Sequence, residues 1–157
     1  MNTLIPTYAL NSHNSWFDEF AATVRAGSNV IDIPAHVERG RETAAWVLDQ
    51  ITAYPESHDQ ATWGCGTTAC VGGWAAVLHL DKAAYHSVAQ HAMLALGLSP
   101  VDAATLFYSA SNRTAIAALT DLVEEGKIDW ASLEVPVVAT EEANMLLGTR
   151  GTMDSNG

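Results

Sequence analysis

Apolar residues recur along most of this chain at the three- and four-residue spacing that places side chains on one face of a helix. Trp16, Phe20 and Val24 stand four residues apart, and Gly27 follows them as a stop signal, so a helix is predicted over about 16–25. The same periodicity predicts further helices over about 34–54, 68–80, 82–96, 100–109, 112–125 and 141–147.

Capping residues mark most of these predicted helix ends. Pro34 suits the first turn of the long second helix, and Ser99 followed by Pro100 gives a cap and a first-turn proline. Gly97 and Gly126 are predicted stops. The other predicted caps are Thr67 or Thr68, Asp81, Ser111 or Asn112, Asp129 for a short turn at Trp130, and Thr140.

The chain lacks the period-2 strand series that a sheet requires, and only residues 29–33 and 135–139 are extended in character. The pattern predicts an all-α fold with about six to eight helices. We expect one multi-helix globular domain over residues 1–147 and a flexible tail over 148–157, which is small and polar.

Composition supports a single domain and limits its partners. The chain has 157 residues, of which 48% are hydrophobic and 16% charged, which is enough apolar material for an ordinary core. Seven basic and eighteen acidic residues give a net charge of −11, which repels phosphate backbones and anionic membranes. We therefore expect neither direct nucleic-acid binding nor membrane binding. An acidic DNA mimic remains an alternative, although the acids are spread along the chain.

The compartment follows from the start of the chain and its cysteines. Residues 1–15 hold no Lys or Arg and no long apolar core, so no secretory or transit signal is expected there, and no apolar run is long enough to span a membrane. Two cysteines are too few for a secreted disulfide framework. These features predict a cytoplasmic protein.

The distinctive stretch is residues 65–75, which begin at Cys65 and contain Cys70 near the start of a predicted helix. A thiol at the positive helix end is favoured as a thiolate, so Cys70 is the candidate catalytic nucleophile. None of the six histidines is marked by its spacing as the required base, and the papain cysteine signature does not match. Burial of Cys70 as a small apolar side chain is the alternative interpretation.

A metal site is a second hypothesis for the same stretch. Cys65 and Cys70, together with His58 or His79, could supply four zinc ligands. A second closely spaced ligand pair, which zinc knuckles usually contain, is missing. We therefore expect no metal and no cofactor.

Gly72 and Gly73 follow no strand and precede no Walker lysine, so they do not indicate a phosphate-binding loop. Small residues here instead predict that this helix packs very close to a neighbour, beside Trp74. Trp63 differs from the other tryptophans because it lies in a polar loop, and it is the candidate partner-binding residue.

The motif Cys65-Gly66-Thr67-x-x-Cys70-x-x-Gly73-Trp74-Ala75, with Trp63 before it and Leu96-Gly97-Leu98-Ser99 after it, resembles one found in small uncharacterised proteins of actinobacteria and their bacteriophages. The resemblance spans about residues 44–130 and implies a source, with no activity attached. We expect a non-enzymatic, phage-encoded interaction protein that binds and modulates a bacterial host protein. The alternatives are a thiol- or metal-dependent enzyme centred on Cys65 and Cys70, and the DNA mimic.

Overall fold

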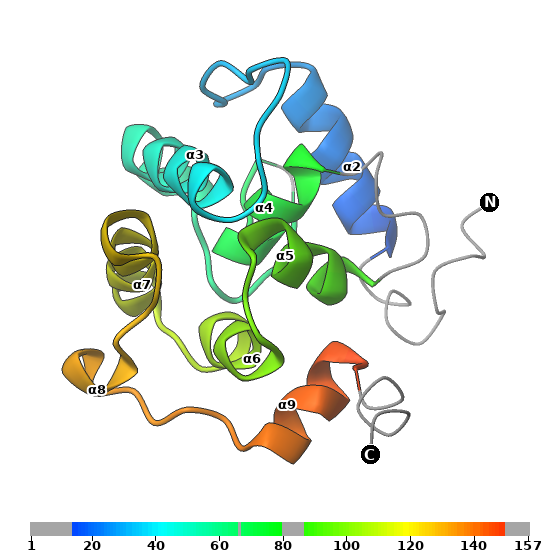
Figure 1. The fold of residues 1–157 in the computed structure, drawn as a ribbon. Helices are drawn as coiled ribbons and strands as arrows, with labels where there is room; N and C mark the ends of the chain where they lie inside the picture. The colour runs from blue at the N-terminus through cyan, green and yellow to red at the C-terminus, as the bar shows by residue number, and fades with distance from the viewer. Residues whose placement is uncertain (1–13, 66, 80–86, 150–157) are drawn as a thin grey trace.

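The structure is a computed structural model that describes residues 14–65, 67–79 and 87–149 (Figure 1). These residues form eight α-helices and one short 3-10 helix, with no β-strand among them. The elements are α2 (Asn14–Arg25), α3 (Arg41–Ala53), η2 (Pro55–Ser57), α4 (Val71–Leu78), α5 (Val88–Leu96), α6 (Pro100–Tyr108), α7 (Asn112–Glu125), α8 (Trp130–Leu133) and α9 (Thr140–Leu147). The all-α prediction is confirmed.

Local capping chemistry explains why several helices begin where the sequence predicts. The side chains of Ser99, Ser111 and Asp129 each accept a hydrogen bond from a backbone N–H in the first turn of α6, α7 and α8. Gly97 and Gly126 end α5 and α7 in the left-handed conformation, with φ of 67° and 79°. Each of these boundaries depends on residues a few positions apart.

The predicted start of α3 at Pro34 is wrong, because α3 begins at Arg41. Gly40 precedes it with a φ of 89°, and its N–H donates to the carbonyl of Ala95 at 2.8 Å instead of continuing a helix. The N–H of Glu38 donates to the side chain of Glu42. The N–H groups of Glu38 and Gly40 therefore form hydrogen bonds that do not belong to a helix.

The predicted caps of α4, α5 and α9 are also wrong in part. Neither Thr67 nor Thr68 caps α4, whose cap is Cys70. Ser87 is extended and caps α5 at Val88, while the predicted cap Asp81 lies outside the described residues. At α9, Thr140 is the first helical residue, and Ala139 occupies the cap position without a side-chain hydrogen bond.

The core is centred on α4, which lies among α2, α3 and α5 in Figure 1. Trp74 of α4 is fully buried, and its ring packs edge-on against Phe20 at a centroid distance of 4.9 Å and tilted against Trp46 at 6.0 Å. In addition, α3 packs against α7, and α6 packs against α9. The helices thus enclose one hydrophobic core.

Two non-helical segments are fixed by side chains from helices. Gln50 of α3 is fully buried, accepts from the N–H of Ile31 and donates to the carbonyl of Asn29. Thr105 of α6 accepts from the N–H of Val138 at 3.0 Å.

Gly148 ends α9, and the predicted tail beyond Thr149 lies outside the described residues. Within the described ranges, no helix has the length and apolar character needed to cross a membrane.

Candidate functional site

The candidate site is the loop that folds over the start of α4. The N–H of Asp59 donates to the carbonyl of Ala69 at 3.1 Å, and the N–H of Ala69 donates to the carbonyl of Ser57 at 3.0 Å. The N–H of Cys70 donates to the carbonyl of Thr62 at 2.7 Å. Residues 57–62 are therefore held against the chain that enters α4.

Gln60 links this loop to three helices. Its amide nitrogen donates to the carbonyl of Leu106, and its backbone N–H donates to the side chain of Asn112. Its amide oxygen accepts from the N–H of Val71 at 2.8 Å and pairs with Nε2 of His58 at 2.8 Å. Because an amide oxygen can only accept, Nε2 of His58 carries a proton. The loop is thus tied to α4, α6 and α7.

Cys70 is buried at the N-terminus of α4, where its Sγ accepts from the N–H of Gly73 at 3.3 Å. Burial raises the pKa of the Cys70 thiol to about 12, and backbone hydrogen bonds from Gly73 and Gly72 offset only part of this rise. The thiol is therefore protonated at neutral pH, which opposes the thiolate expected from the helix end. The alternative interpretation, in which Cys70 is a small buried side chain, matches its position in the structure.

The four candidate metal ligands are not gathered at one point. Cys65 is exposed, and Cys70 is buried. His58 pairs with Gln60, whereas His79 lies at the C-terminal end of α4. Nowhere in the part of the chain that the structure describes do three His, Cys, Asp or Glu side chains form a group suited to a metal ion.

Trp63 is half-buried and forms the wall that the glycines of α4 contact. A Cβ atom on Gly73 would lie 2.0 Å from the carbonyl oxygen of Trp63, and one on Gly72 would lie 2.6 Å from its ring. The predicted close contact is confirmed. The nearest neighbour of Gly73 is the backbone of the loop at Trp63, and the nearest neighbours of Gly72 are the rings of Trp63 and of Phe107 in α6.

Trp63 also packs against the end of α6. Its ring meets Phe107 at 5.3 Å and Tyr108 at 6.0 Å between centroids, both nearly perpendicular to it. These three aromatic rings, residues 60–62 and Cys70 line a hollow of about 160 Å³. Burial raises the pKa of Tyr108 to about 12, so its hydroxyl is neutral at physiological pH. The lining combines these rings with the polar residues Gln60 and Thr62, and it contains no side chain that is charged at neutral pH.

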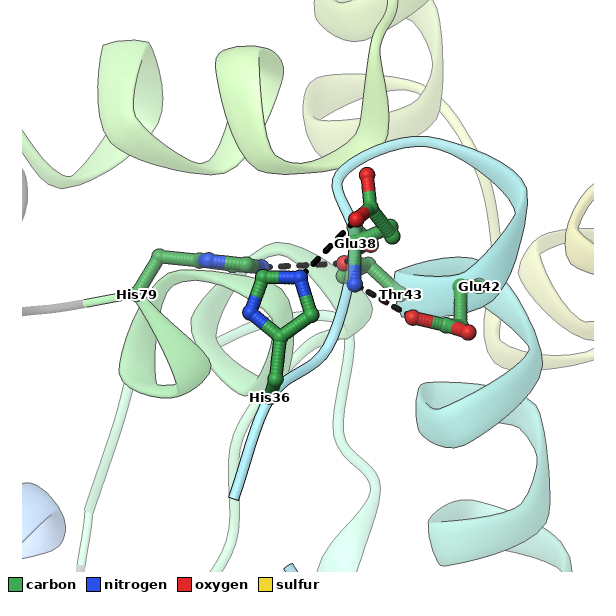
Figure 2. A network of polar contacts seen from close by, with 5 residues as sticks. All are labelled: His36, Glu38, Glu42, Thr43 and His79. Carbon is green, nitrogen blue, oxygen red and sulfur yellow. Dashed lines mark hydrogen bonds and ion pairs between the residues drawn. The ribbon is translucent and has the colours of Figure 1, made fainter. Parts of the chain in front are cut away.

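A second site, which is polar, lies where residues 36–39 before α3 meet the C-terminal end of α4 (Figure 2). The hydroxyl of Thr43 donates its one proton to the carbonyl of Glu38 at 2.6 Å, so it accepts from Nε2 of His79 at 2.9 Å. Nε2 of His36 pairs with the Glu38 carboxylate at 2.9 Å on the surface. Residues 36–39 and His79 line a hollow of about 390 Å³.

The sequence carries no signal for this second site, because His36 and His79 are 43 positions apart and become neighbours only when α4 packs on α3. Thr43 is fully buried, and its hydroxyl donates to a carbonyl, so it is not poised as a nucleophile. The polar contacts among these residues tie the segment before α3 to α4.

The fold and the site define a small all-α protein whose motif residues shape an aromatic-lined hollow beside the start of α4. Comparisons of the chain with protein-family models, with curated proteins and with solved structures found no match.

Proposed function

We propose that this chain is a non-enzymatic interaction protein that binds another protein and modulates it. The resemblance of residues 65–75 to proteins of actinobacteria and their phages extends the proposal to its setting. The chain is phage-encoded, acts in the cytoplasm of the bacterial host, and binds a host protein.

The observation that carries the proposal is the hollow between Trp63 and the end of α6. Aromatic-lined hollows of this kind accept apolar anchor side chains, and they concentrate binding energy in a few residues. Tyr108 lines the hollow and is 44% exposed, so a partner can reach it. A single Leu, Met or Pro side chain from the partner matches the size of the hollow.

The chemistry of Cys70 argues against the thiol-enzyme alternative. A nucleophilic cysteine needs a lowered pKa and a base that takes its proton. Here burial raises the pKa of the thiol to about 12, and Nε2 of His58 donates to Gln60. The thiol instead accepts a hydrogen bond from the first turn of α4.

Affinity capture from an actinobacterial lysate tests the proposal, with Tyr108→Ala compared with Ile116→Ala. The two side chains are exposed to a similar extent, 44% and 38%, and urea unfolding of each variant checks that it remains folded. We expect a stoichiometric protein partner whose affinity falls about tenfold or more with Tyr108→Ala, because loss of an anchor typically costs more than 1 kcal/mol. Ile116 on α7 does not line the hollow, and its change should have little effect.

Three outcomes would contradict this assignment. If no protein is retained, or if both variants weaken binding equally, the hollow is not an anchor site. If the partner is a DNA-binding protein that DNA displaces, and Tyr108→Ala leaves its affinity unchanged, the DNA-mimic alternative is favoured.

A further inference from the structure

The outer side of α9 and the segment before it form an exposed surface that combines apolar and acidic residues. Its apolar members are Val137, Met145 and Leu146, which are 52%, 59% and 37% exposed, and its acidic members are Glu141 and Glu142. We call these five residues the α9 surface. Their exposure leaves a substantial part of three large apolar side chains in contact with water.

The α9 surface is held in place from behind. Ala143, Asn144 and Leu147 form the buried side of α9, which packs on α6. The side-chain amide of Gln90 in α5 donates to the carbonyl of Gly148 at 2.8 Å, which fixes the end of the helix. The exposed side chains therefore project from a helix that is anchored at both its face and its end.

The sequence stretch that carries this surface, between Lys127 and Arg150, has charged side chains of one sign. Residues 128–149 contain four acidic side chains and no Lys or Arg. The acidic residues are Asp129, Glu134, Glu141 and Glu142. All four are exposed. A partner with positive charge around an apolar centre would complement this surface, and its encounter would be steered electrostatically.

The same charge argues against a second copy of the chain as the occupant. A two-fold dimer through the α9 surface would bring the acidic pairs of both copies into one interface, and the surface itself has no Lys or Arg to neutralise them. Like charges brought together at an interface are destabilising, and the net charge of −11 on each copy adds to the repulsion.

We infer that the α9 surface docks onto a protein surface with an apolar centre and a rim of Lys and Arg. This inference rests on the proposed function and supplies the chemistry of the partner. Val137, Met145 and Leu146 provide the apolar contact, while Glu141 and Glu142 meet the basic rim. None of these five residues lines the hollow beside Trp63.

A synthetic helical peptide with leucines on one face and lysines on the other is the probe, and fluorescence anisotropy measures its binding to the full chain. We expect saturable binding that weakens as salt is added. Val137→Ser combined with Met145→Ser should weaken it about tenfold, and Glu141→Gln combined with Glu142→Gln roughly fivefold. A matched leucine–glutamate peptide should not bind.

The matched control is Glu124→Gln combined with Glu125→Gln, an acidic pair of the same size on α7. If this control weakens the peptide as much as the α9 pair does, the peptide senses overall charge and the inference is overturned. Sedimentation velocity checks the other occupant. A dimer of the full chain that Met145→Ser dissociates would identify a second copy and would also overturn the inference.

The capture experiment separates this inference from the proposed function. A host protein that is retained by the Val137→Ser, Met145→Ser variant but lost with Tyr108→Ala would overturn the α9 assignment and leave the proposed function standing. Circular dichroism and urea unfolding of each variant establish that the folded fraction is the same.

Discussion

Gly73 lies so close to the loop that covers α4 that a methyl group has no room there. The nearest atom to a Cβ at this position would be the carbonyl oxygen of Trp63, and Cβ of Ala69 would follow at 2.9 Å. Gly72 differs, because its close neighbours are the rings of Trp63 and Phe107. Cys70 completes the turn as the cap of α4. The two glycines allow the loop to approach α4 closely, and Cys70 accepts a hydrogen bond at the start of the helix.

Gly73→Ala should lower the free energy of unfolding by about 1 to 3 kcal/mol, because overpacking against a backbone atom exceeds the gain in helix propensity of roughly 1 kcal/mol. Gly72→Ala should cost less, since rings can shift more readily than backbone. Urea unfolding of both single variants measures this difference. Stabilisation by both alanines would show that the close contact does not limit this helix.

The buried thiol predicts a loss of stability at alkaline pH. Its pKa is raised from an ordinary value of 9.0 to about 12. Burial of the protonated thiol therefore makes its full contribution to the free energy of unfolding below pH 9, and this contribution is lost as the pH rises toward 12. At pH 10 the wild type should have lost about 1 kcal/mol more than Cys70→Ser, relative to pH 8. Urea unfolding at the two values tests this, with each protein referenced to itself, since Tyr108 titrates in both. Parallel losses would contradict the burial of the thiol.

At the scale of elements, the start of α3 is a junction between three helices. Arg41, its first residue, donates from Nε and Nη2 to the carbonyl of Val123 at 3.1 and 2.6 Å, and from Nη2 to that of Glu124 at 3.1 Å. These carbonyls lie in the last turn of α7, where a cation also interacts favourably with the helix dipole. Gly40 bonds to Ala95 of α5. Contacts with α5 and α7 thus fix where α3 begins.

Arg41→Ala should lower the free energy of unfolding by about 1 to 2 kcal/mol, because the charged donors to the end of α7 are lost. Arg113→Ala is the control, since Arg113 is an exposed arginine near the N-terminus of α7, where a positive charge is unfavourable. It should change stability by less than about 0.5 kcal/mol. Equal effects would indicate that overall charge, and not the junction, is responsible.

At the scale of the whole molecule, a hydrophobic core is combined with strong excess negative charge. The helices around α4 bury Trp74, Trp46 and Trp130, whereas eighteen acidic residues face only seven basic ones. Self-repulsion of this kind destabilises the compact state, and dissolved salt screens it. Burial of apolar side chains in the core therefore offsets the repulsion among the acidic side chains.

Raising NaCl from about 10 to 300 mM should increase the melting temperature by roughly 2 to 5 °C, because repulsion among the acidic side chains is screened. The Glu124→Gln, Glu125→Gln variant has a net charge reduced by two and should respond less. Thermal unfolding followed by circular dichroism at several salt concentrations provides the test. A melting temperature that falls with NaCl would mean that attractive ion pairs outweigh the repulsion.

The sequence by itself determined the helical class and the boundaries that local chemistry sets. Ser99 with Pro100, Ser111 and Gly126 act on backbone groups within a few positions, so their roles can be identified before any tertiary contact is known. The close approach at Gly73 was also predictable, because a glycine inside a helix has few other uses. The partner in that contact was not.

Only the tertiary structure decided the features that depend on residues far apart in the chain. Gly40 ends the segment before α3 because Ala95 lies beside it, and Thr43 brings His79 to the same polar network. Burial beneath the loop at Trp63 sets the protonation of Cys70, against the influence of the helix end. Desolvation and packing depend on what surrounds a group in space, and the spacing of residues along the chain does not specify those surroundings.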